Sequence, residues 1–141
     1  MFAALGEADP RPGTITEANL RLLRIMLIVQ IVLGLLWGVS MLFFAQQIVL
    51  ESASGPHIEK IAFEGAAHMM LVAGAFLVWR SPARSGGVLW LMIFLNALWT
   101  VTDLVYIPLV DLSQLDFYVK TVVNAFLAVG LALSGRRAGI V

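Results

Sequence analysis

The sequence predicts an all-α integral membrane protein, a four-helix bundle whose helices run alternately up and down. Of its 141 residues, 60% are apolar and 13% are charged, whereas soluble domains have about 45–50% and about 25%. Four segments are long and apolar enough to cross a hydrocarbon layer, which needs about 20 residues. The expected spans are residues 22–45, 61–79, 88–107 and 117–133. Together they form one predicted bundle over residues 20–135.

The first span follows a cytoplasmic N-terminal arm, residues 1–19, which contains no apolar run of signal-peptide length. We therefore expect no cleaved targeting segment, and the first span serves as its own insertion signal. Thr14, with Glu17 three positions later, matches a capping box. This pattern predicts that the first helix begins near Ile15.

A short connection joins the second and third spans. Pro56 suits the first position of a helix, so we expect the second helix to begin there. Ser81, Pro82, Gly86 and Gly87 then interrupt the apolar sequence. Because the connection is short, the two helices are expected to be antiparallel neighbours.

The third and fourth spans are separated by a second set of helix signals. Pro108 ends or kinks the third helix. Ser113, with Asp116 three residues later, is another capping pattern and predicts that the fourth helix begins just before Phe117. A short cytoplasmic tail, residues 136–141, follows it.

The distribution of basic residues predicts the orientation of the bundle. Seven of the nine fall on the side shared by the termini and the second connection: Arg11, Arg21, Arg24, Arg80, Arg84, Arg136 and Arg137. Only Lys60 and Lys120 fall toward the other side. Because basic residues flanking spans stay in the cytoplasm, we expect both termini to be cytoplasmic. The expected location is the bacterial plasma membrane.

Composition also limits the function. Nine basic and nine acidic residues give no net charge, so no global field attracts nucleic acid. The chain has no cysteine, which excludes thiolate catalysis and disulfides. The expected partners are the lipid bilayer and either a small hydrophobic ligand, a second copy or another membrane protein.

Polar residues interrupt the last three spans at helical spacing. The candidate site residues are Glu64, His68, Asn96, Thr100, Asp103, Lys120 and Asn124. Within each span they fall on one stripe, because four residues advance a helix by about 400° and seven by about 700°. Polar and ionisable residues at membrane depth are costly and usually face the interior of a bundle. We therefore expect an outward-facing polar pocket.

Three charges fall about one turn inside the outer boundary, on Glu64, Asp103 and Lys120. Lys120 can pair with either acid, and we predict an ion pair with Asp103. Glu64 and His68 are then expected to face the ligand. One carboxylate is left over, which must be protonated, hydrated, bonded to His68 or paired with a ligand or partner cation.

Several functions fit this arrangement. A binding pocket for a small amphipathic or aromatic molecule, in an accessory protein without catalysis, ranks first, because it needs only polar anchors in an apolar cleft. A small isomerase-like or hydrolase-like enzyme with Glu64 and His68 as acid and base is an alternative, although no catalytic residue can be assigned. Another is an assembly subunit of a larger complex. A polar network that only fixes the helix register is the structural alternative. We expect no metal and no cofactor.

Other features are expected to serve packing. Gly34 and Gly38 form a G-x-x-x-G motif, and packing within this bundle is favoured over dimerisation, although the oligomeric state stays open. Gln30 is interpreted as a residue that forms a hydrogen bond across a helix interface. Trp37 and Trp99 are interpreted as core or lipid-facing side chains.

Three segments support a family resemblance: the start of the second span (Phe63 to His68), the turn from Trp79 to Arg84 and the end of the third span (Trp99 to Ile107). Over about residues 20–133, the chain resembles the small four-helix bacterial membrane proteins of the BphX-like and DoxX-like kind. In some bacteria these are encoded near oxidation or aromatic-degradation genes. The resemblance implies a membrane accessory role and transfers no catalytic residue.

Overall fold

The computed structural model describes residues 17–44, 55–106 and 115–141. Its long elements are four helices: α1 (Glu17–Phe43), α3 (Gly55–Arg80), α4 (Gly86–Tyr106) and α5 (Leu115–Arg137). All four are long and apolar enough to cross a membrane. The expected all-α fold is confirmed, and its four helices have the length and composition of a multi-pass membrane protein.

The ends of the helices follow the local sequence signals where they can be compared. α3 begins at Gly55, one residue before Pro56. A short helix, η1 (Pro82–Arg84), fills the connection between α3 and α4. The Ser85 hydroxyl donates to the Ser81 carbonyl oxygen at 2.8 Å and closes this turn. The expectations for Thr14, Pro108 and Ser113 lie outside the described residues.

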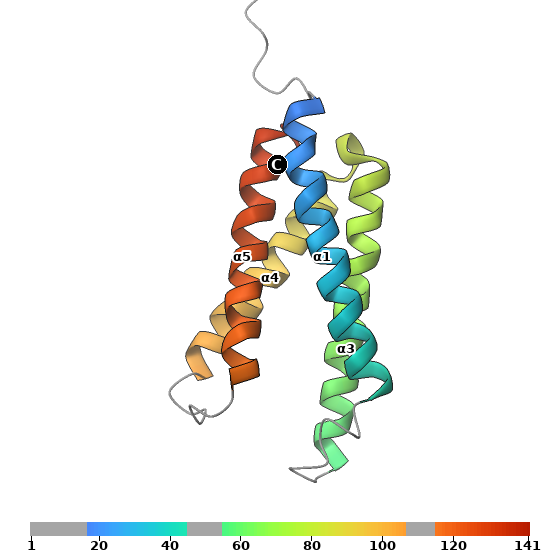
Figure 1. Cartoon of the computed structure of the whole chain (residues 1–141), viewed down its shortest axis with the longest axis vertical. Coiled ribbons are helices and arrows are strands. Elements are labelled where there is room, and N and C mark those ends of the chain that lie inside the picture. The colour runs from blue at the N-terminus through green and yellow to red at the C-terminus, as the bar shows by residue number, and fades with distance from the viewer. Residues whose placement is uncertain (1–16, 45–54, 107–114) are drawn as a thin grey trace, which may run out of the picture.

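The helices run alternately up and down and form two pairs (Figure 1). α1 packs most extensively against α3, and α4 against α5, whereas α3 and α4 contact each other less. At one end the two pairs are in contact, and at the other they diverge (Figure 1). The short connection therefore joins the two pairs, α1–α3 and α4–α5.

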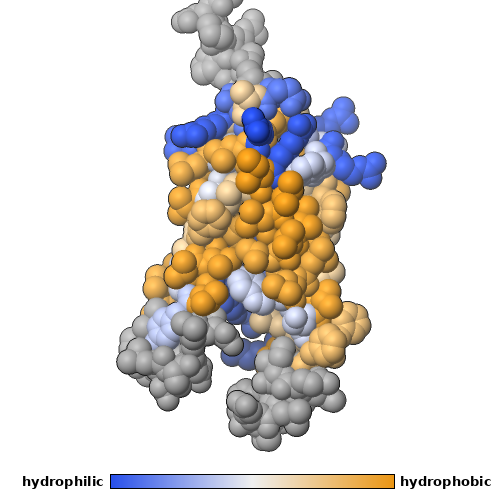
Figure 2. Space-filling view, in the orientation of Figure 1, coloured by the Kyte–Doolittle hydropathy of each residue, from blue (hydrophilic) through white to orange (hydrophobic). Residues whose placement is uncertain are grey.

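The two ends of the bundle differ in chemistry. We call the end at which α1 begins and α5 finishes the arginine end, after Arg21, Arg24, Arg80, Arg84, Arg136 and Arg137. Figure 2 shows hydrophilic residues concentrated there and a broad hydrophobic belt next to them. The other end, where α3 and α5 begin, is called the opposite end.

The apolar core lies in the half of the bundle next to the arginine end. Its largest fully buried side chains are Leu23, Leu27, Leu89, Met92, Leu127 and Leu131, to which α3 adds Leu71, Ala75 and Val78. All four helices contribute, so this core holds the two pairs together. It closes the interior of the bundle at the arginine end.

The α1–α3 pair is held by a very close approach at glycines. A Cβ on Gly65 would lie 2.9 Å from Met41 Cβ and 3.0 Å from the carbonyl oxygen of Gly38. A Cβ on Gly34 would lie 2.6 Å from Val72 Cγ2. Small residues let helix backbones approach in this way in membranes. The glycine motif thus packs within the bundle, as predicted.

Candidate functional site

The half of the bundle next to the opposite end has an unusual interior. Over residues 31–44, 59–70, 97–105 and 118–126, the described residues that are buried are Gly34, Gly38, Gly65, His68, Asp103, Thr121 and Asn124. Every one is a glycine or carries a polar side chain. Large apolar side chains of this half, such as Phe63, Val101 and Val122, are exposed instead. The polar stripes of α3, α4 and α5 therefore face inward.

An ion pair links the two helix pairs near the opposite end. Lys120 Nζ on α5 donates to Glu64 Oε1 on α3. Both side chains are mostly buried, at 17% and 24% exposure. The predicted pairing of Lys120 with Asp103 is wrong. The reason is that Asp103 on α4 binds Thr121 on the adjacent α5, while the Lys120 side chain extends from α5 to α3.

Asp103 accepts a hydrogen bond from the Thr121 hydroxyl, with 3.2 Å between Oγ1 and Oδ2. Its exposure is 8%. In the described part of the chain, no lysine, arginine or histidine forms an ion pair with it. The leftover carboxylate expected from the sequence is therefore Asp103.

A hydrogen-bonded pair lies at the boundary with the apolar core. Asn96 Nδ2 on α4 donates to Gln30 Oε1 on α1 at 3.0 Å and to the Met92 carbonyl oxygen at 2.8 Å. Thr100 Oγ1 donates to the Asn96 carbonyl oxygen at 2.8 Å. Gln30 and Asn96 have exposures of 1% and 0%. This is a second polar link between the two helix pairs.

His68 contacts two tryptophans. Its ring centroid is 4.6 Å from that of Trp99 on α4 and 5.8 Å from that of Trp37 on α1, and both contacts are tilted. The residue is 2% exposed, yet its Nε2 atom has no hydrogen-bond partner among the described residues. Glu64, one turn away on the same face, is engaged by Lys120.

Two further buried polar atoms have no partner in the described ranges. They are Asn96 Oδ1 on α4 and Asn124 Nδ2 on α5. An unpaired buried polar group costs about 1–3 kcal/mol, and native interiors contain few of them. Here three helices contribute one each, counting His68 Nε2 on α3.

The contacts fix the order of these residues along the bundle. Glu64 with Lys120, and Asp103 with Thr121, form the layer nearest the opposite end. His68 and Asn124 each lie four residues further along parallel helices, about 6 Å deeper. Gln30 and Asn96 are deeper again, since Asn96 precedes Asp103 by seven residues, or about 10 Å. The result is a polar column that ends at the apolar core.

The column is approached from the opposite end. Figure 2 shows a recess there between the two helix pairs, with hydrophilic atoms visible inside it. Glu64 and Lys120, in the layer nearest this end, are partly exposed. We call this opening the recess.

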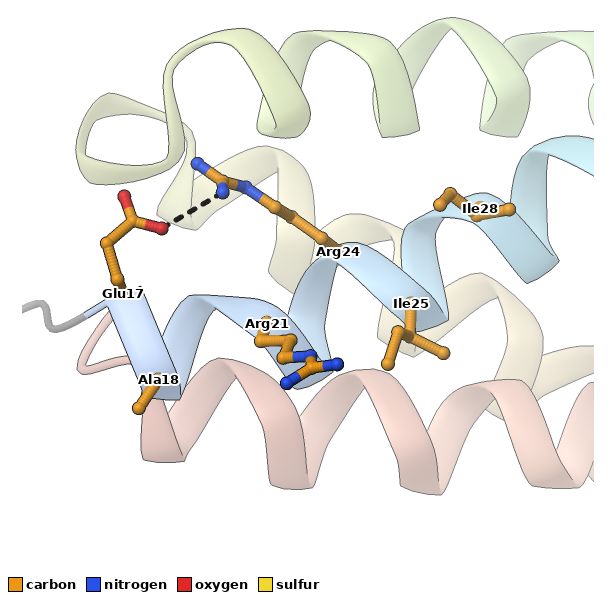
Figure 3. A pocket seen from close by; sticks show the side chains of 6 residues that line it. All are labelled: Glu17, Ala18, Arg21, Arg24, Ile25 and Ile28. Carbon is orange, nitrogen blue, oxygen red and sulfur yellow. Dashed lines mark hydrogen bonds and ion pairs between the residues drawn. The ribbon is translucent and has the colours of Figure 1, made fainter.

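A different depression lies along α1 at the arginine end (Figure 3). Its described lining comes from one helix and includes Glu17, Arg21 and Arg24. Arg24 donates to Glu17 at 3.1 Å across this surface. Both side chains are well exposed, and the polar column lies in the other half, so this depression is no part of the candidate site.

The described residues contain no group of three or more His, Asp or Glu side chains placed to hold one metal ion. Comparison with known proteins adds no further assignment. No family model, no curated protein and no solved structure matches the chain. The resemblance to the BphX-like and DoxX-like proteins stays a prediction.

The structure brings the seven predicted site residues to the inner side of the bundle, buried or, for Glu64, Thr100 and Lys120, partly buried. Sequence reasoning left out Thr121, although its hydroxyl binds Asp103. It also set aside Gln30, Trp37 and Trp99. The sequence offered one hint for Gln30, a polar side chain deep inside an apolar span. It offered none for the two tryptophans, because aromatic residues at helical spacing usually belong to ordinary packing.

Proposed function

We propose that this protein binds a small amphipathic molecule in the polar column, as an accessory protein of the bacterial plasma membrane. The observation that carries the proposal is the set of three unpaired buried atoms, His68 Nε2, Asn96 Oδ1 and Asn124 Nδ2. They come from three helices: His68 and Asn124 lie in the half of the bundle whose buried described residues are all glycine or polar, and Asn96 lies at its boundary with the apolar core. A ligand with a polar group would recover the hydrogen bonds that these atoms lack.

A network that only fixes the helix register would look different. Its members would satisfy one another, because a partly satisfied buried network is worse than an apolar core. The Asn96–Gln30 and Asp103–Thr121 bonds fit that description. The unpaired atoms of His68 and Asn124 do not, and they lie between those two bonded layers.

The proposed orientation has both termini in the cytoplasm. The arginine end carries six of the described basic residues, whereas Lys60 and Lys120 lie toward the opposite end. By the positive-inside rule the arginine end faces the cytoplasm. The recess then opens to the outer side, and the apolar core separates the site from the cytoplasm.

The proposal is tested by native mass spectrometry of the protein released from lipid nanodiscs. The wild type should retain a small molecule, and Asn124→Leu should lose it, because leucine fills the same space without the amide. The matched control is Ser134→Ala, since Ser134 is fully buried in the other half and already bonded to the Leu131 carbonyl oxygen.

Retention by both variants alike, or by neither variant nor the wild type, would contradict the proposal. A second protein chain retained in fixed ratio, and lost in Asn124→Leu, would replace it with the assembly-subunit hypothesis. The same spectra report the oligomeric state of the protein.

A further inference from the structure

We infer that the ligand of this site is a protonated amine attached to an apolar, aromatic-sized body. The inference rests on the proposed function and specifies the class of molecule. It comes from the charges, the lone pairs and the aromatic rings that the column presents together.

The charges inside the column do not balance. Its charged side chains, in the described residues, are Glu64, Asp103 and Lys120. Lys120 is engaged by Glu64, and the partner that the described part of the chain offers Asp103 is the uncharged Thr121 hydroxyl. A carboxylate held in a membrane interior is stabilised by a cation. When Asp103 is ionised, a neutral ligand would leave its charge uncompensated, and an anionic ligand would add a second.

The unpaired atoms also favour a hydrogen-bond donor. Asn96 Oδ1 is an acceptor, and His68 Nε2 accepts when the ring proton is on Nδ1. Asp103 has lone pairs beyond the one used by Thr121. The unpaired donor among these atoms is Asn124 Nδ2, so acceptors outnumber donors. An ammonium group offers several N–H donors and no acceptor, which matches this excess.

The aromatic rings supply the remaining surface. Trp99 precedes Asp103 by four residues, so the two side chains lie on the same face of α4, one turn apart. Trp37, on α1, also contacts His68, with 5.8 Å between ring centroids. Indole rings attract a cation placed over their face and pack against an apolar body. An amine at Asp103 would have its body against these rings.

The test compares two probes of matched shape, 2-(2-naphthyl)ethylammonium and the neutral 2-(2-naphthyl)ethanol. Their affinities are measured by equilibrium dialysis against protein in nanodiscs of zwitterionic lipid, with empty nanodiscs subtracting partition into lipid. We expect the wild type to bind the ammonium at least about tenfold more tightly than the alcohol, the effect of one charge-assisted contact. Asp103→Asn should reduce this ratio to about one, and Asp103→Glu should keep it above one.

The outcomes separate the inference from the proposed function. Equal affinity of the wild type for the two probes, with both weakened by Asn124→Leu, would overturn the cationic class and leave the binding site in place. Binding of neither probe above empty nanodiscs, or binding insensitive to Asn124→Leu, would overturn both. Circular dichroism of Asp103→Asn and Asp103→Glu shows whether each variant is folded, and Ser134→Ala should bind both probes as the wild type does.

Discussion

Lys120 and Glu64 form the ion pair that joins α5 to α3, and within the described ranges no other ion pair links two helices. Each residue belongs to a different helix pair, so the contact bridges the two pairs in the layer nearest the opposite end. Removing one partner of a largely buried ion pair leaves an uncompensated charge, and the expected loss of stability is about 3 kcal/mol.

Lys120→Met should therefore lower the free energy of unfolding by about 3 kcal/mol. Adding Glu64→Gln should restore part of the loss, because both charges are then gone. The measurement is unfolding in mixed detergent micelles followed by circular dichroism. The control is Glu17→Gln, which breaks the exposed pair with Arg24 and should cost less than about 1 kcal/mol. Additive effects of the two changes in the double variant would contradict a direct pair.

Gly65→Ala should weaken the contact between α1 and α3. A Cβ at this position would meet Met41 Cβ and the backbone of Gly38 and Leu42, and backbone cannot give way as a side chain can. We expect a loss of about 1–3 kcal/mol, typical of overpacking. Gly87→Ala is the matched control, because nothing lies within 4 Å of a Cβ there. The thermal unfolding midpoint of Gly65→Ala should be clearly lower than that of Gly87→Ala. Equal midpoints would mean that α1 and α3 can move apart to accommodate the added methyl group without losing stability.

His68→Phe should retain the ring contacts with Trp37 and Trp99 while removing the unpaired nitrogen. The expected result is unchanged or higher stability together with loss of the bound molecule, since binding sites commonly trade stability for function. Unfolding and native mass spectrometry on one sample report both quantities. A loss of more than about 2 kcal/mol would show that the imidazole makes a structural hydrogen bond.

The bond between Gln30 and Asn96 should show as a coupling energy. Hydrogen bonds between helices in membranes contribute about 0.6 kcal/mol on average and up to about 1.7 kcal/mol. Gln30→Leu and Asn96→Leu should each destabilise the protein, and the double variant should lose less than the sum. A double-mutant cycle on unfolding free energies gives the coupling. A coupling of zero would mean that the two side chains do not interact.

The orientation can be tested because the chain has no cysteine, so one engineered thiol reports alone. Lys60→Cys lies toward the opposite end and Ser81→Cys in the connection after α3, and both residues are exposed. A membrane-impermeant maleimide should label the first in intact cells and the second only after permeabilisation. The reverse pattern would place the recess on the cytoplasmic side.

The sequence was sufficient for the four helices and for the inward direction of the polar stripes. Span length and apolar composition determine the helices, and helical periodicity puts Glu64 with His68, and Asn96 with Asp103, on common faces. The sequence was not sufficient to predict which carboxylate pairs with Lys120. That choice depends on how the helices are arranged around the bundle, and periodicity along one helix carries no such information.

The same limit explains why Gln30, Trp37 and Trp99 were set aside. Gln30 matters because it accepts a hydrogen bond from Asn96, and the tryptophans matter because both contact His68. Each role is a relation between residues on different helices. Single residues of these types are common in ordinary packing, so sequence alone gave no reason to prefer them.

Confinement of the apolar core to one half has a mechanical consequence. Toward the opposite end, the polar links between the two helix pairs in the described residues are the Lys120–Glu64 and Asn96–Gln30 contacts. Spreading the pairs there would break a few polar bonds and leave the leucine core intact. Amide hydrogens of that half should therefore exchange through small openings, while those beside Leu23 and Leu131 wait for complete unfolding. Entry of a ligand would then require movement only in the half of the bundle next to the opposite end.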